Sequence, residues 1–143
     1  MSSLSSLNLA VIGNCQIASL LDERGRMIWT CLPQFDSDPA FCSLLMPDNP
    51  EPELGFYEIE LVDFERAEQQ YIRNTPILQT TLYDSNGNAV RITDFAPRYQ
   101  YLGRSYRPVM MIRSITPVEG WPQIRVRLRP ASASLIICFV LLS

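Results

Sequence analysis

The stretch that decides the fold is Thr75-Pro-Ile-Leu-Gln-Thr-Thr-Leu-Tyr-Asp-Ser-Asn86-Gly87-Asn-Ala89-Val-Arg-Ile-Thr-Asp-Phe95. Two runs rich in β-branched and aromatic residues flank Asn86-Gly87. Asn-Gly between such runs is the strongest short-range hairpin signal, because both residues accept the positive φ of a tight turn. The sequence therefore predicts a β-hairpin with strands at residues 75–83 and 89–95.

Similar patterns occur earlier in the chain. Residues 15–21 and 26–32 flank Asp22-Glu-Arg-Gly25, where Gly25 can supply a positive φ, so a second hairpin is expected. Residues 55–62 alternate loosely between polar and apolar side chains, which favours a strand with one buried face. Residues 65–73 are expected to pair with that strand.

A further strand is predicted late in the chain, where Ile124, Val126 and Leu128 alternate with arginines. One of its faces should be apolar and the other cationic. Prolines interrupt residues 32–54, which favours loops with at most a short helix at residues 40–45. Short strands without long helices predict an all-β fold, an antiparallel β-sandwich with little helix.

Composition limits the function. A chain of 143 residues with 47% hydrophobic and 19% charged side chains is expected to form one globular domain. A net charge of -3 argues against nucleic acid or an anionic membrane as a partner. The chain has no histidine, which removes the commonest metal ligand and general base, so we expect neither a metal nor a cofactor.

The cysteines and the N-terminus indicate in which cellular compartment the protein is expected. Cys15, Cys31, Cys42 and Cys138 follow no CxxC spacing and are expected to be reduced, buried small hydrophobes. The first nine residues lack the basic start and apolar stretch of a secretory signal, which predicts a cytoplasmic protein.

A linked series of segments resembles one known family. It consists of Leu9-Ala-Val-Ile-Gly-Asn-Cys-Gln-Ile-Ala-Ser-Leu-Leu21, then residues 25–29, then Cys31-Leu-Pro-Gln-Phe-Asp-Ser-Asp38. Residues 69–80, Asp94-Phe-Ala-Pro-Arg98 and the arginine-rich residues 125–130 follow in order. Together they resemble the trehalase-like N-terminal domain of glycoside hydrolase family 15, the family of glucoamylase and trehalase-like enzymes.

The resemblance implies a β-rich, non-catalytic domain at residues 9–130, part of a supersandwich. In the family a helical (α/α) barrel follows and hydrolyses α-glucosides with inversion, using two glutamates that project from the barrel. No glutamate of this chain occupies a matching motif, so no catalytic residue is assigned and the chain alone is expected to be inactive.

The two ends of the chain differ in character from the segments between them. Residues 1–8 are predicted to be flexible. Residues 131–143 end in an apolar run of eight residues, 135–142, which is too short for a membrane span. The change of character after Pro130 is interpreted as a frameshift or truncation, with one buried strand as the alternative.

The resemblance also singles out candidate contacts. The loop at residues 33–39 is a candidate to reach sugar or the barrel, and Gln34 stands there where the family usually has arginine. The alternative for the loop aspartates is that they cap turns by accepting backbone N–H bonds. The candidate contacts with substrate or barrel are Gln34, Phe35, Asp36, Ser37, Asp94, Arg98 and Trp121.

Aromatic and cationic side chains complete the predictions. Trp29 is expected to pack in the core, whereas Trp121 lies in a turn and is a candidate for stacking on a sugar ring. Arg125, Arg127 and Arg129 are candidates to dock on an acidic surface of the barrel, the alternative being a solvated strand face.

The function expected first is an accessory domain that packs against the (α/α) barrel and shapes its cleft. The alternative is a free-standing β-sandwich that binds carbohydrate, either α-glucan or trehalose, or another protein.

Overall fold

The computed structural model describes residues 7–46, 54–131 and 139–142, and it is almost entirely β-structure. The first sheet has the order β1-β2-β3-β5-β12, with β4 paired to β3. Its strands are β1 (Ala10–Gly13), β2 (Ala18–Leu21), β3 (Met27–Cys31), β4 (Pro39–Phe41), β5 (Phe56–Leu61) and β12 (Ile124–Arg129).

The second sheet has the order β13-β11-β8-β7-β6. Its strands are β6 (Phe64–Tyr71), β7 (Leu78–Asp84), β8 (Ala89–Phe95), β11 (Ile112–Glu119) and β13 (Phe139–Leu142). Two short strands, β9 (Tyr99–Tyr101) and β10 (Arg104–Tyr106), form a separate hairpin. Every pairing is antiparallel except that of β11 with β13, so the predicted all-β antiparallel sandwich is confirmed.

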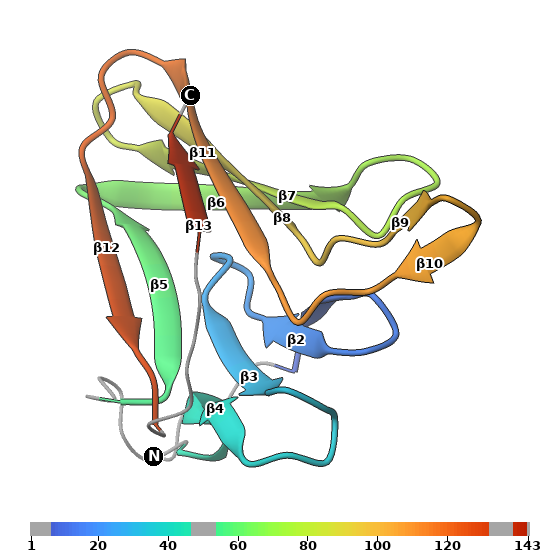
Figure 1. The fold of residues 1–143 in the computed structure, drawn as a ribbon. Helices are drawn as coiled ribbons and strands as arrows, with labels where there is room; N and C mark the ends of the chain where they lie inside the picture. Colours follow the sequence, from blue (N-terminus) through green and yellow to red (C-terminus); the bar gives the residue numbers. More distant parts are fainter. Residues whose placement is uncertain (1–6, 47–53, 132–138, 143) are drawn as a thin grey trace.

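The core lies between the two sheets, whose strands cross in Figure 1. A single cluster of buried side chains joins them, so the described residues share one hydrophobic core. Its members include Ile12, Leu21, Met27, Phe41, Tyr57, Ile59 and Leu61 from the first sheet and Leu78, Leu82, Val90, Ile92 and Ile115 from the second.

Both predicted hairpins are present. Strands β2 and β3 are joined through Gly25 at φ 75°, and β7 and β8 through Gly87 at φ 83°. In the second turn the carboxylate of Asp84 accepts the N–H groups of Asn86 and Asn88 at 2.8 Å each. These hydrogen bonds fix the turn that the Asn-Gly pair allows.

The predicted pairing of residues 55–62 with 65–73 is wrong. Strand β5 pairs with β3 and β12, whereas β6 pairs with β7 in the opposite sheet. The turn between them includes Asp63 in the left-handed region at φ 58°, and it carries the chain from one sheet to the other. Strand β5 is also buried on both faces rather than one, because Glu58 is paired with Arg26, which precedes β3, and with Arg127 of β12.

Smaller expectations are refined or corrected. The short helix allowed at residues 40–45 is limited to one 3-10 turn, η1 (Ser43–Leu45). Residues 39–41 form β4 instead, because Phe41 pairs with Thr30 and packs in the core. Trp29 is half-buried rather than enclosed. Of the three cysteines within the described residues, Cys31 is buried, and burial raises the pKa of its thiol. Cys42 is half-buried and Cys15 is exposed.

Some predictions lie partly outside the described residues. Residues 1–6, 132–138 and 143 are not described, so the predicted flexible N-terminus is untested. Residues 139–142 of the apolar tail form β13, and Cys138 falls outside. Within the described part of the chain, no helix has the length and apolar character needed to cross a membrane.

Candidate functional site

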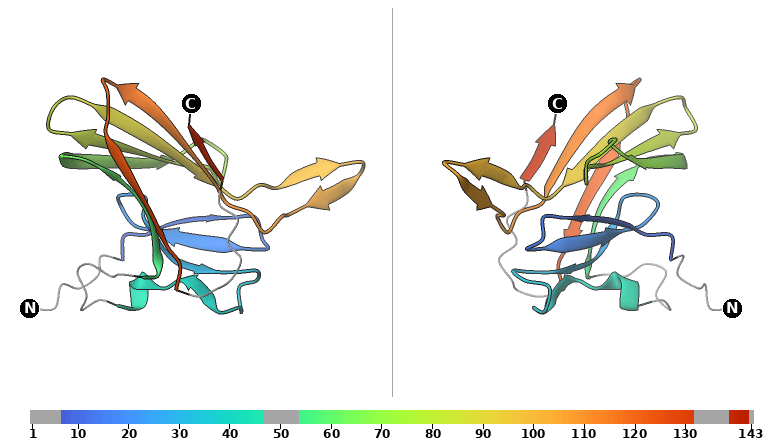
Figure 2. Two further views of the ribbon diagram at one scale, coloured as in Figure 1. Left: turned by 60° about the vertical axis from the view of Figure 1, so that its left-hand side comes forward. Right: turned by 90° about the vertical axis from the view of Figure 1, so that its right-hand side faces the viewer.

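Three of the segments that carry the family resemblance lie together at one end of the sandwich. The turn from β1 to β2, the loop from β3 to β4 and the start of the β9–β10 hairpin lie on the same side in Figure 1 and in both views of Figure 2. We call this region the loop end. In Figure 2 the β9–β10 hairpin projects from it, away from both sheets.

Asn14 fixes the position of the hairpin. Its side chain is buried, and Nδ2 donates to the carbonyl oxygens of Pro97 at 3.0 Å and Pro108 at 2.8 Å. Those two carbonyls lie where the chain enters and leaves the hairpin. Oδ1 of Asn14 accepts the N–H groups of Gln16 and Ile17 within its own turn. One amide therefore ties the hairpin base to the β1–β2 turn.

The hairpin displays tyrosines and arginines. The rings of Tyr99 and Tyr106 stack with centroids 5.4 Å apart, and Tyr101 lies against Tyr106 with centroids 6.5 Å apart. All three side chains are exposed. Arg104 and Arg107 accompany them, and no acidic residue occurs in residues 96–112. The projection is thus cationic and aromatic, a composition common in protein interfaces.

Arg98 opens this hairpin and is exposed. Its Nη1 lies 3.8 Å from Sγ of Cys15, which holds the left-handed conformation at φ 70° in the β1–β2 turn. The structure therefore brings the predicted Arg98 next to the Gly-Asn-Cys segment of the resemblance.

The β3–β4 loop contributes four of the predicted residues. Gln34 and Ser37 close a turn, since Oγ of Ser37 accepts the N–H of Gln34 and the N–H of Ser37 donates to the carbonyl of Gln34, both at 3.2 Å. Phe35 and Asp36 lie at the surface, and the residue Phe35 is 59% exposed. Ser37, and not Asp36, supplies the side-chain acceptor in this turn, while Phe35 and Asp36 remain accessible.

Asp94 lies elsewhere. Its carboxylate is fully buried and accepts two hydrogen bonds from Arg113, Nε to Oδ1 at 2.8 Å and Nη2 to Oδ2 at 3.1 Å. Arg113 also donates to the carbonyls of Tyr57 and Gly25 in the first sheet. Burial raises the pKa of Asp94 and the guanidinium opposes that rise. Asp94 neither caps a turn nor reaches solvent, because it joins the two sheets through Arg113.

The arginines of β12 are also engaged within the fold. Arg125 lies opposite Glu60, with Nη1 3.3 Å from Oε2, and Arg127 lies opposite Glu58, to which it donates. The predicted cationic face is therefore one side of a ladder of ion pairs with β5. Arg125 and Arg129 remain exposed at this edge of the sheet, whereas Arg127 is half-buried. The apolar face is incomplete as well, because Val126 is exposed on the same edge strand.

Trp121 is far from the loop end. It lies in the turn between β11 and β12, on the opposite side of the molecule in Figures 1 and 2, and is 92% exposed. The structure therefore brings Gln34, Phe35, Asp36, Ser37 and Arg98 to one end and leaves Asp94, Trp121 and the β12 arginines in three other places. Among the described residues, no cluster of three potential metal ligands occurs.

Sequence reasoning missed the hairpin and the role of Arg113. Leu102 at φ 49° and Gly103 at φ 73° form the hairpin tip, so a turn signal was present in the sequence. Its strands are only three residues long and fully exposed, so they lack the alternation that marks a buried strand.

Part of this chain is similar to known proteins. Over 91 residues, 64% of this chain, it is 33% identical to trehalase 2 of Sulfolobus acidocaldarius. Over 90 residues it is 31% identical to the trehalase of Thermoplasma volcanium. The chain is similar to trehalases.

This trehalase-like similarity spans only 14% of the length of each relative. No family model matches the chain, and neither does any solved structure. The relationship is therefore to a small part of a glycosidase.

Proposed function

We propose that this chain is the non-catalytic N-terminal domain of a glycoside hydrolase of family 15, and that it packs against an (α/α) catalytic barrel. The observation that carries the proposal is the loop end. There, three segments of the family resemblance lie together beside a hairpin of exposed tyrosines and arginines. The similarity to trehalases supports the same assignment.

The loop end has the properties of a docking surface. Phe35 and the hairpin tyrosines offer apolar area, and aromatic side chains and arginine are enriched in protein interfaces. The buried amide of Asn14 holds the hairpin in place before any partner binds, which lowers the entropy that docking costs. In the complete enzyme this surface contacts the barrel and shapes one side of its cleft.

Catalysis belongs to the barrel in this proposal. Inverting hydrolysis needs two carboxyl groups about 6.5 to 9.5 Å apart on opposite sides of the scissile bond. Asp94 is enclosed by protein and bound to Arg113, so it cannot meet a substrate. Asp36 is accessible on the loop end, where it is a candidate to contact sugar or barrel rather than to act as half of a catalytic pair. The substrate is an α-glucoside such as trehalose or α-glucan, and a cytoplasmic location remains a prediction.

A segment exchange tests the proposal. In the Thermoplasma volcanium trehalase, the segment similar to this chain is replaced by the corresponding residues, and the release of glucose from trehalose is measured. We expect the chimaera to be active and the isolated chain to release no glucose from trehalose, maltose or soluble starch.

The control is a chimaera that also carries Phe35→Ala, Tyr99→Ala and Tyr106→Ala, three exposed positions whose replacement leaves the core intact. It should show a lower thermal midpoint or lower activity than the parent chimaera. Glucose release by the isolated chain, abolished by Asp36→Asn, would overturn the non-catalytic assignment. Equal stability and activity of the two chimaeras would overturn docking through the loop end.

A further inference from the structure

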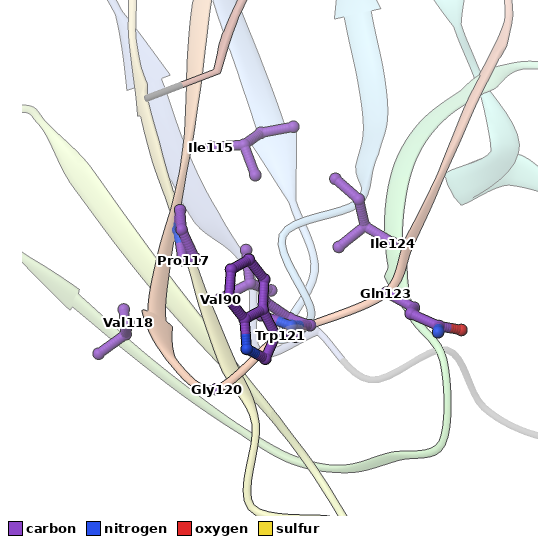
Figure 3. Close-up of a pocket in the computed structure, with 9 residues that line it drawn as sticks. Val90, Ile115, Pro117, Val118, Gly120, Trp121, Gln123 and Ile124 are labelled. Atoms are coloured by element: carbon purple, nitrogen blue, oxygen red, sulfur yellow. The ribbon is translucent and has the colours of Figure 1, made fainter.

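A pocket of about 810 Å³ lies at the end of the sandwich where β11 turns into β12. It is lined by the last residues of β11, the connecting turn, the first residue of β12 and one side chain of β8. Figure 3 shows the indole of Trp121 among the lining side chains, between the chain at Pro117 and the chain at Ile124. The volume is within the range of small-molecule sites in proteins, roughly 300 to 1,000 Å³.

The backbone that carries Trp121 is fixed. Its N–H donates to Oδ1 of Asn88 at 2.9 Å, and Nδ2 of Asn88 donates to Oδ2 of Asp84 at 2.7 Å. Gly120 before it has φ 65°, and a Cβ at that position would lie 2.1 Å from Oδ1 of Asn88. The turn thus holds a large apolar ring in solvent although nothing in the core requires it there.

The chemistry of the lining indicates the kind of ligand. None of its nine residues is charged, and most of them are apolar. The polar side-chain groups are the indole N–H of Trp121 and the exposed amide of Gln123 at the rim. A ligand that fits is uncharged, has a flat apolar face for the indole, and keeps its other groups in water. A pyranose ring meets these conditions, since its C–H face stacks on an aromatic ring while its hydroxyls stay hydrated.

We propose that this pocket binds a neutral α-glucoside, with one glucosyl ring stacked on Trp121. The lining fits a pyranose ring, and the choice of an α-glucoside rests on the proposed function. The inference is independent of docking to a barrel, because the pocket and the loop end lie at opposite ends of the molecule. Both sites can be occupied at once. Few directed hydrogen bonds are available, so we expect a dissociation constant on the order of 1 mM.

Tryptophan fluorescence tests the proposal directly, because the chain contains only two tryptophans. The Trp29→Phe variant leaves Trp121 as the single indole. It is titrated with maltotriose and with trehalose up to about 50 mM, a range that covers millimolar dissociation constants. We expect a saturable change in emission with at least one of the two sugars. The same sugar should give saturable heat in calorimetry of the unaltered chain.

Matched variants distinguish stacking on Trp121 from the general effect of removing an exposed apolar side chain. Trp121→Ala should weaken binding at least tenfold without unfolding the chain, because the side chain makes few packing contacts. Leu102→Ala removes another exposed apolar side chain, at the hairpin tip, and should bind sugar as the unaltered chain does. A chain that binds neither sugar would overturn the proposal, as would undiminished binding by Trp121→Ala. If Trp121→Ala instead abolishes self-association in sedimentation while no sugar binds, the pocket receives protein and the proposal is overturned.

Discussion

Arg113 of β11 and Asp94 of β8 lie directly opposite each other, joined by two hydrogen bonds of 2.8 and 3.1 Å, and both side chains are wholly excluded from solvent. Arg113 extends from this pair across the core to carbonyl groups of the other sheet, and its guanidinium lies over the ring of Tyr57. The pair therefore links the two sheets with directed bonds where hydrophobic contact alone would allow sliding.

Removing one member of this pair should be costly. Asp94→Asn keeps the shape of the side chain but leaves the arginine buried without its counter-charge. We expect the free energy of unfolding to fall by about 3 to 5 kcal/mol, the usual consequence of an uncompensated buried charge. Urea denaturation followed by circular dichroism measures it. The double variant Asp94→Leu/Arg113→Met should lose less than the sum of the two single losses, and additive losses would show that the two residues act independently.

The stability of the β7–β8 turn should depend on pH through Asp84. Hydrogen bonds from the Asn88 side chain and from the backbone N–H groups of the turn hold the pKa of this carboxyl below its ordinary value of 3.8. A lowered pKa in the folded state stabilises the fold above pH 3.8, and the contribution disappears as the pH falls through the folded value. Asp84→Asn should therefore be less stable than the unaltered chain at pH 6, with the difference shrinking as the pH falls below 3.8. A difference that is constant with pH would contradict this assignment.

The anchor of the hairpin can be removed without touching the hairpin itself. Asn14→Asp keeps the acceptor for Gln16 and Ile17 but loses the donors to Pro97 and Pro108. We expect faster hydrogen exchange at residues 99–106 and a loss of about 2 kcal/mol in global stability, because the carbonyl of Pro97 loses its amide donor and that of Pro108 keeps only the N–H of Met110. Exchange in β7 and β8 serves as the internal reference. Unchanged protection of the hairpin would show that the amide does not hold it.

The ion-pair ladder between β5 and β12 should be uneven. Arg127 is 37% exposed and pairs with Glu58, whereas Arg125 is 64% exposed and pairs with Glu60. We expect Arg127→Ala to cost about 1 kcal/mol and Arg125→Ala less than about 0.5 kcal/mol, because solvent screens the outer pair. Thermal denaturation at low and high salt measures both. The Arg125 effect should vanish in high salt, and a larger loss for Arg125 than for Arg127 would reverse this order.

Substitutions at two glycines distinguish the cost of backbone strain from the cost of a steric clash. Gly87 and Gly120 both have positive φ, but a Cβ at Gly87 meets nothing within 4 Å, whereas one at Gly120 meets Asn88. Gly87→Ala should cost about 1 kcal/mol from the left-handed conformation alone. Gly120→Ala should cost more and also shift the emission of Trp121, whose backbone N–H would lose its acceptor. Equal losses in denaturation, with unchanged emission, would show that the turn adapts to the added methyl.

Local signals in the sequence predicted the fold class and its hairpins. Gly25 and Asn86-Gly87 specify turns through backbone geometry, and that information is contained within a few residues. Which strands share a sheet is different, because alternation defines the faces of a strand and not its partners. The wrong pairing of residues 55–62 with 65–73 arose in this way.

The candidate site was predictable in part. The family resemblance identified the segments that meet at the loop end, but it did not indicate that Asp94 is enclosed. An arginine between Ile112 and Ser114 has the sequence pattern of a solvent-facing position on a strand, and only the first sheet packed against it makes it a buried cation. Such burial depends on contacts between residues distant in the sequence, which periodicity does not encode.

The side chain of Asn14 fixes the position of the hairpin by hydrogen bonds at its two ends, outside strands β9 and β10. Because both ends of the hairpin are held at Pro97 and Pro108, its length and tip can change while the sandwich beneath stays the same. Leu102 and Gly103 at the tip have no role in the core. The residues of the hairpin can thus be replaced while the sandwich stays folded. The domain can accept foreign sequence there, or acquire a new specificity.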